Sequence, residues 1–178
     1  MKKIGVFCAS SDRMEAVYYE KASELGRWLG ETGRTLVYGG AASGLMEAVA
    51  KATKENGGTV YGIVPRKLFQ NDRVSDYIDV TIPCEDLSDR KQLLVDHSEI
   101  MVVMPGSVGT FDEAFCALAA NTFGLHSKRL IFWNVNGYYD KLFEFFDSLE
   151  GQGVLNKPWN EIMYRVNELE EIKVICGE

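Results

Sequence analysis

Histidine and cysteine are scarce in this 178-residue chain, which has two of the first and four of the second. The cysteines lie far apart, without the short spacings of metal-binding or redox motifs. We therefore expect no metal site and no cofactor, and thiols that stay reduced as in a cytoplasm. These four residues are Cys8, Cys84, Cys116 and Cys176.

Long apolar runs are also missing, and none approaches the ~18 residues that a membrane-spanning helix needs. The apolar stretch from Ile4 to Ala9 is too short for a signal peptide and soon reaches Asp12 and Arg13. We interpret it as a first strand. The expectation is a cytoplasmic protein without a membrane partner.

Positive charge is in deficit, because 19 lysines and arginines face 26 aspartates and glutamates, for a net charge of −7. A surface that follows nucleic acid normally carries a basic excess. We therefore expect no nucleic-acid partner, and a local basic cluster would be informative.

Short apolar runs alternate with segments of helical periodicity along the whole chain. This alternation predicts an α/β fold, a doubly wound and mostly parallel sheet with helices on both faces. No linker or repeat interrupts it, so residues 1–178 are expected to form a single domain. The expected strands are Ile4–Cys8, Thr35–Tyr38, Thr59–Val64, Tyr77–Ile82, Ile100–Met104, Leu130–Trp133 and Ile162–Val166.

The most informative stretch runs from Val102 to Glu113 and predicts a strand, a tight glycine loop and a helix that begins near Thr110. Glycines let the backbone approach a ligand, and the first N–H groups of a helix have no partner inside it. Such a place binds anions, phosphate above all. The expected phosphate contacts are Gly106, Ser107, Val108, Gly109 and Thr110.

Two other loops of small residues follow predicted strands, one at Ser10 and one at Gly39 and Gly40. In doubly wound sheets ligands bind beyond the carboxyl ends of the strands, so these loops are expected to meet the Gly106 loop in one pocket. Ala41 stands where a dinucleotide fingerprint has its middle glycine, and no P-loop motif is present. Neither a nicotinamide enzyme nor a P-loop ATPase is predicted. The alternative for Gly39 and Gly40 is a simple tight turn.

Glu113 has two interpretations. Thr110-x-x-Glu113 has the spacing of a capping box, which explains the carboxylate structurally and is favoured by spacing alone. Its position one turn from a proposed phosphate suggests a chemical role instead. A carboxylate beside a phosphate requires a cation nearby.

Arg90 and Lys91 supply candidate cations, because they share a helical stripe with Leu87 and Leu94. Buried charge needs an anionic partner, which here is a ligand or a carboxylate. Alternatively, both side chains extend outward or pair with neighbouring aspartates of their own helix.

The motif P-G-x-x-G-T-x-x-E at Pro105 to Glu113, preceded by the pair Arg90-Lys91, resembles the Lonely Guy family of cytokinin riboside 5′-monophosphate phosphoribohydrolases, often mislabelled lysine decarboxylases. The resemblance implies a Rossmann-like fold, a homodimer, and hydrolysis of the N-glycosidic bond of a nucleoside 5′-monophosphate, AMP or N6-modified AMP, to free base and ribose 5-phosphate. It also implies that Arg90 and Glu113 are catalytic. This chain departs from the family pattern at Ser107 and Ala119, among other positions.

Our hypothesis for the site is that phosphate rests on the Gly106 loop, that Arg90 and Lys91 neutralise it, and that Glu113 stabilises positive charge at the anomeric carbon. Arg90 has a second candidate role, which is to position Glu113. The rival hypothesis is a nucleotide or molybdenum-cofactor carrier, which needs the loop but no catalytic carboxylate.

Overall fold

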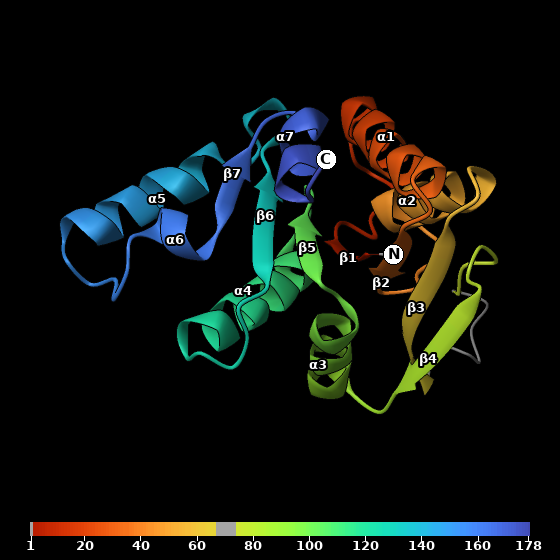
Figure 1. Ribbon diagram of the computed structural model, residues 1–178, viewed down its shortest axis with the longest axis horizontal. Coiled ribbons are helices and arrows are strands. Elements are labelled where there is room, and N and C mark those ends of the chain that lie inside the picture. The colour runs from red at the N-terminus through yellow and green to blue at the C-terminus, as the bar shows by residue number, and fades with distance from the viewer. Residues whose placement is uncertain (1, 67–73) are drawn as a thin grey trace.

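Seven short strands form one sheet in the order β4-β3-β2-β1-β5-β6-β7, and every neighbouring pair is parallel. The computed structural model describes residues 2–66 and 74–178 (Figure 1). The strands are β1 Lys3–Phe7, β2 Thr35–Tyr38, β3 Thr59–Pro65, β4 Val80–Cys84, β5 Ile100–Val103, β6 Arg129–Trp133 and β7 Tyr164–Val166.

Helices cover both faces of the sheet. Because side chains alternate along a strand, the buried strands contribute to two separate cores, one on each face. Ile4 and Val6 of β1 belong to one core and Phe7 to the other. The first core lies under α1 Ala16–Glu31, α2 Gly44–Glu55 and α7 Leu169–Ile175. The second lies under α3 Leu87–His97, α4 Val108–Thr122, α5 Asp140–Gly151 and α6 Trp159–Ile162, and a short 3₁₀ turn, η2 Val135–Gly137, precedes α5. The predicted doubly wound α/β fold is confirmed, with a sheet that is parallel throughout.

The strand order reverses at the centre of the sheet, where β1 pairs with both β2 and β5. From β1 the chain first builds outward through β2, β3 and β4, and then returns to lay β5 on the other side. Phe7 and Val103 are register partners, so the loops that leave β1 and β5 start side by side. A parallel sheet binds ligands at such a switch point.

Several element boundaries differ from the sequence prediction. The fourth strand begins at Val80 instead of Tyr77, because Asp79 first turns its carboxylate to the N–H of Val60, 2.9 Å away. The last strand is short and begins at Tyr164, after the separate helix α6.

The first helix begins at Ala16, beyond the polar loop Ser10-Ser11-Asp12. Asp12 caps a different helix, because its carboxylate accepts the N–H of Gly44 at 2.8 Å, where α2 starts. The polar stretch after Pro65 falls mostly in residues 67–73, outside the described residues. No helix in the described ranges is both long and apolar enough to cross a membrane.

Candidate active site

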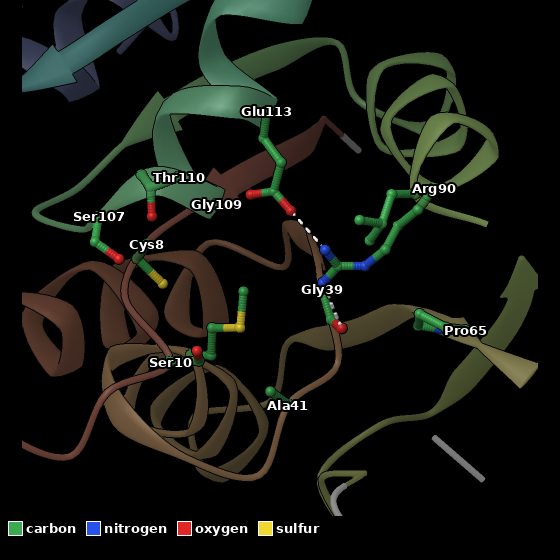
Figure 2. A pocket seen from close by; sticks show the side chains of 12 residues that line it. Cys8, Ser10, Gly39, Ala41, Pro65, Arg90, Ser107, Gly109, Thr110 and Glu113 are labelled. Atoms are coloured by element: carbon green, nitrogen blue, oxygen red, sulfur yellow. Dashed lines mark hydrogen bonds and ion pairs between the residues drawn. The ribbon is translucent and has the colours of Figure 1, made fainter. Parts of the chain in front are cut away.

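A cleft of about 250 Å³ opens at the switch point, where the loops after β1, β2 and β5 meet (Figure 2). The three small-residue loops expected to converge do so, through Ser10, Gly39 and Ser107. Helix α3 adds Arg90, and α4 adds Glu113. The residues that line the cleft are Cys8, Ser10, Gly39, Ala41, Met46, Pro65, Leu87, Arg90, Ser107, Gly109, Thr110 and Glu113.

The centre of the cleft is a buried ion pair between Arg90 and Glu113, which point toward each other from α3 and α4 (Figure 2). Nη1 of Arg90 lies 2.8 Å from Oε1 of Glu113. The two side chains are only 15% and 6% exposed, so water screens the pair weakly. The carboxylate that meets Arg90 thus comes from a neighbouring helix, and not from the aspartates of its own helix that were the alternative.

The backbone holds the rest of the Arg90 guanidinium. Nη2 donates to the carbonyl of Gly39 at 2.9 Å, and Nε donates to the carbonyl of Ile63 at 3.3 Å. All three side-chain nitrogens of Arg90 therefore have acceptors, which lie after β2, on β3 and on α4. A Cβ atom on Gly39 would stand 1.9 Å from Nη2, so the glycine is what admits the guanidinium.

Glu113 is not a capping residue. Helix α4 begins at Val108 with Ser107 as its N-cap, so Glu113 lies in the second turn, beyond reach of the orphan N–H groups. Burial raises the pKa of Glu113 to about 7, although the neighbouring Arg90 pulls it down. At neutral pH this carboxyl group thus exchanges readily between its charged and neutral forms.

The loop from Gly106 to Thr110 presents a row of unused donors. Among the described residues, no acceptor meets the backbone N–H of Gly106, Ser107, Val108, Gly109 or Thr110. Fully formed α-helix bonding starts only with the N–H of Phe111, which donates to Ser107 at 3.0 Å. A row of free N–H groups at the start of a 15-residue helix favours an anion.

The Gly39 loop differs, because the helix that follows it begins with N–H groups that already have acceptors. The first N–H groups of α2 are already taken, since Gly44 donates to Asp12 at 2.8 Å and Leu45 donates to the carbonyl of Ala9 at 2.9 Å. Gly39 contributes a carbonyl to Arg90, and Gly40 turns the chain with a φ of 77° without lining the cleft. Of the two helices that follow these glycine loops, only α4 thus begins with N–H groups that have no acceptor among the described residues.

Four other predicted contacts stand apart from the lining, namely Gly40, Lys91, Gly106 and Val108. Lys91 turns to the outer side and pairs with Asp112 at 2.8 Å. It therefore forms a second ion pair between α3 and α4, next to the one between Arg90 and Glu113.

Sequence reasoning missed the apolar lining and the thiol of Cys8. Met46, Pro65 and Leu87 carry no chemical signal in the sequence, and only the fold brings them together. Burial, reinforced by Glu113, raises the pKa of the Cys8 thiol far above its ordinary value, so it stays protonated and is a poor nucleophile. Of these four residues, only Cys8 has a signal in the sequence, which is its place directly after the first strand.

Fold and site together define a doubly wound α/β protein whose central cleft joins a donor-rich glycine loop to a buried arginine–glutamate pair. A family model described as "Possible lysine decarboxylase" matches residues 46–174. Cytokinin riboside 5′-monophosphate phosphoribohydrolase LOG5 of Arabidopsis thaliana is 32% identical over 96% of this chain and 75% of its own length. The chain therefore belongs to this family of possible lysine decarboxylases, whose curated relatives carry the phosphoribohydrolase name, and the resemblance drawn from the motifs is confirmed.

Solved structures with this fold cover nearly the whole chain. An X-ray structure of a structural genomics target matches with a TM-score of 0.77 at 25% identity, over 99% of this chain and 98% of that one. The molybdenum cofactor carrier protein of Chlamydomonas reinhardtii matches with a TM-score of 0.75 at 24% identity, over 99% of both chains. At that identity the second likeness shows the fold alone.

Proposed function

We propose that this protein hydrolyses the N-glycosidic bond of a nucleoside 5′-monophosphate, AMP or an N6-modified AMP, and releases the free base and ribose 5-phosphate. The observation that carries the proposal is the buried pair of Glu113 and Arg90 beside an open anion-binding loop. The curated relatives named as phosphoribohydrolases support the reaction class.

The Gly106 loop is the proposed phosphate site. Backbone N–H groups that bond a charged oxygen contribute ~1.5–3 kcal/mol each, against ~0.3–1 kcal/mol for the helix dipole. The donors therefore dominate. The hydroxyls of Ser107 and Thr110, which both line the cleft, add further donors.

Glu113 is the proposed catalytic carboxylate. In Figure 2, Ser107 and Thr110 lie on one side of the ion pair and Pro65 on the other, which supports a ribose over Glu113 and a base toward the apolar end. As the bond from C1′ to the base nitrogen breaks, its electron pair leaves with the base and positive charge grows on C1′. An ionised Glu113 favours that state over the neutral substrate. Water then adds to C1′, and the departing base takes up a proton.

Arg90 is proposed to position Glu113 and balance its charge. Its nitrogens already donate to Glu113, Gly39 and Ile63, so its planar fork is committed to protein acceptors. Its charge offsets the repulsion between Glu113 and a bound phosphate from a distance. Lys91, paired with Asp112, supports the same helix contact from outside.

A panel of nucleotides tests this proposal against a carrier function. Purified protein is incubated with AMP, GMP, CMP, UMP and N6-substituted AMP, and free base is measured by chromatography. Release of base with ribose 5-phosphate from at least one of them is the expected result. Tight binding without release would instead favour the carrier, for which Glu113 has no task.

We also propose that two copies associate through the outer side of α4. Phe115 lies on α4, Phe123 comes directly after the last residue of that helix, and Leu125 comes two residues later. Phe123 and Leu125 are 83% and 78% exposed, which is unusual for side chains of this size. Helix α5 buries Phe143 and Phe146 and leaves Phe145 exposed.

A further inference from the structure

Two consecutive tyrosines hold the Gly106 loop by its carbonyl groups. The hydroxyl of Tyr138 donates to the carbonyl of Gly106 at 2.7 Å, and that of Tyr139 donates to the carbonyl of Met104 at 2.7 Å. The carbonyl between them, on Pro105, accepts the N–H of Ala9 at 3.1 Å. Three successive carbonyl groups of the loop are thus fixed by donors.

The direction of these carbonyls sets the direction of the donors that follow them. In a trans peptide the C=O and the next N–H point in opposite directions, and no described peptide bond here is cis. The bond from Tyr138 therefore turns the N–H of Ser107 away from Tyr138. The hydrogen bond from Ala9 to the carbonyl of Pro105 likewise turns the N–H of Gly106 away from Ala9.

Other contacts place the tyrosines where they can act on the loop. The N–H of Tyr139 donates to the side-chain oxygen of Asn134 at 2.7 Å, and its ring stands edge-on to that of Tyr138 at 5.1 Å. The turn before them needs left-handed backbone, with a φ of 53° at Asn136 and 73° at Gly137. Tyr139 is 1% exposed and Tyr138 is 38% exposed, so of these two hydroxyl groups only that of Tyr138 can be removed with little effect on the core.

We propose that Tyr138, supported by Tyr139, is a positioning residue that keeps the N–H groups of the Gly106 loop turned toward a phosphate. It thereby sets the preference of the site for 5′-phosphorylated nucleosides over free nucleosides. This inference rests on the proposed function of the same site. It adds a residue that does not line the cleft, and a specificity that depends on it.

The test is Tyr138→Phe, which removes one hydroxyl and keeps the ring. Loss of a single hydrogen bond predicts an increase of about five- to tenfold in the KM for AMP, with kcat within about twofold. Adenosine lacks the phosphate, so its hydrolysis is expected to stay unchanged. The matched control is Tyr18→Phe, because the Tyr18 ring packs edge-on against Tyr138 at 5.5 Å while its hydroxyl has no bond to the described residues of the loop.

Equilibrium binding of AMP and of inorganic phosphate by the same variants separates this inference from the reaction. If the unaltered protein hydrolyses no nucleotide, the proposed function fails, and weaker AMP and phosphate binding by Tyr138→Phe still supports the positioning role. Unchanged binding of both probes overturns it. An equal loss of kcat/KM on AMP and adenosine also overturns it, since a merely structural role would impair both.

Discussion

Replacing Glu113 with glutamine tests the central charge of the site with little change in shape. The amide oxygen of the introduced glutamine still accepts from Nη1 of Arg90, but the negative charge is gone. Removal of one preorganised electrostatic group lowers turnover by ~10²–10³. We expect a fall in kcat of that size on whichever nucleotide is the best substrate, measured by release of free base.

The same substitution is expected to stabilise the protein above neutral pH. The pKa of Glu113 rises from 4.5 to about 7 on folding, mainly because the carboxyl group is buried. At ~1.4 kcal/mol for each tenfold change in the acid constant, the ionised form costs ~3 kcal/mol of folding free energy. A raised pKa means that this contribution is fully favourable below pH 4.5 and is lost as the pH climbs through about 7. Glutamine stays neutral, so at pH 8 the variant should unfold at a higher temperature and a higher urea concentration.

Asp112→Asn is the matched control for Glu113→Gln. It removes the same charge one residue earlier, from a side chain that is 48% exposed and paired with Lys91. We expect activity within a few fold of the unaltered protein and no gain in stability at pH 8, because exposed pairs contribute little. If Glu113→Gln retained full activity on a verified substrate, the catalytic assignment would be wrong. If it were less stable than the unaltered protein at pH 8, the argument from burial would be wrong.

Four further predictions concern the surroundings of this pair. The kcat/KM should rise with pH around an apparent pKa near 7, because the ionised form of Glu113 is the active one, and a profile that falls instead would assign it as an acid. Arg90→Lys should lower kcat by about 100-fold, because one ammonium group cannot donate to Glu113, Gly39 and Ile63 in the geometry of a planar guanidinium. Full activity of this variant would contradict the positioning role. Gly39→Ala should lower kcat about tenfold by displacing the guanidinium, whereas Gly151→Ala, with open space around it, should leave kcat unchanged in the same assay. Phe123→Glu should reduce the mass measured by light scattering from twice 19.9 kDa to 19.9 kDa, and an unaltered mass would exclude association through α4.

The fold was predictable because the central strands are apolar runs and the longer helices have their own periodicity, whereas the short edge strand β7 and helix α6 have neither signal. The strand order was not, since no residue of β1 signals that β5 will pair beside it. Only the general rule that ligands bind at a switch point connected the Ser10 loop with the Gly106 loop before the structure. The rule gave the location of the cleft, and the packing of α2 and α3 gave its apolar lining.

The two glycine loops illustrate a limit of local motifs. Both follow a strand and precede a helix, so both predict free N–H groups. Their difference comes from Asp12, a residue more than thirty positions from Gly44 in the sequence, whose carboxylate occupies the start of α2. Long-range capping of this kind cannot be predicted from the residue spacing near Gly39. The sequence also does not distinguish a glycine that makes room for an arginine side chain from one that makes room for a phosphate.

Glu113 shows how a spacing argument can be decided by burial. A capping box requires the helix to begin just after Thr110, yet the structure starts α4 earlier, at Val108. Glu113 then falls on the same buried stripe as Ala114 and Ala117, where an acidic side chain has no structural reason to be. Arg90 stands in the same position on α3, a charge on the side that faces the sheet. Two unexplained charges of opposite sign on inward stripes of neighbouring helices predict each other, because a buried charged group needs a partner that can accept or donate its hydrogen bonds. The ion pair was therefore implicit in the helical patterns of α3 and α4, and was hidden only by the competing capping motif.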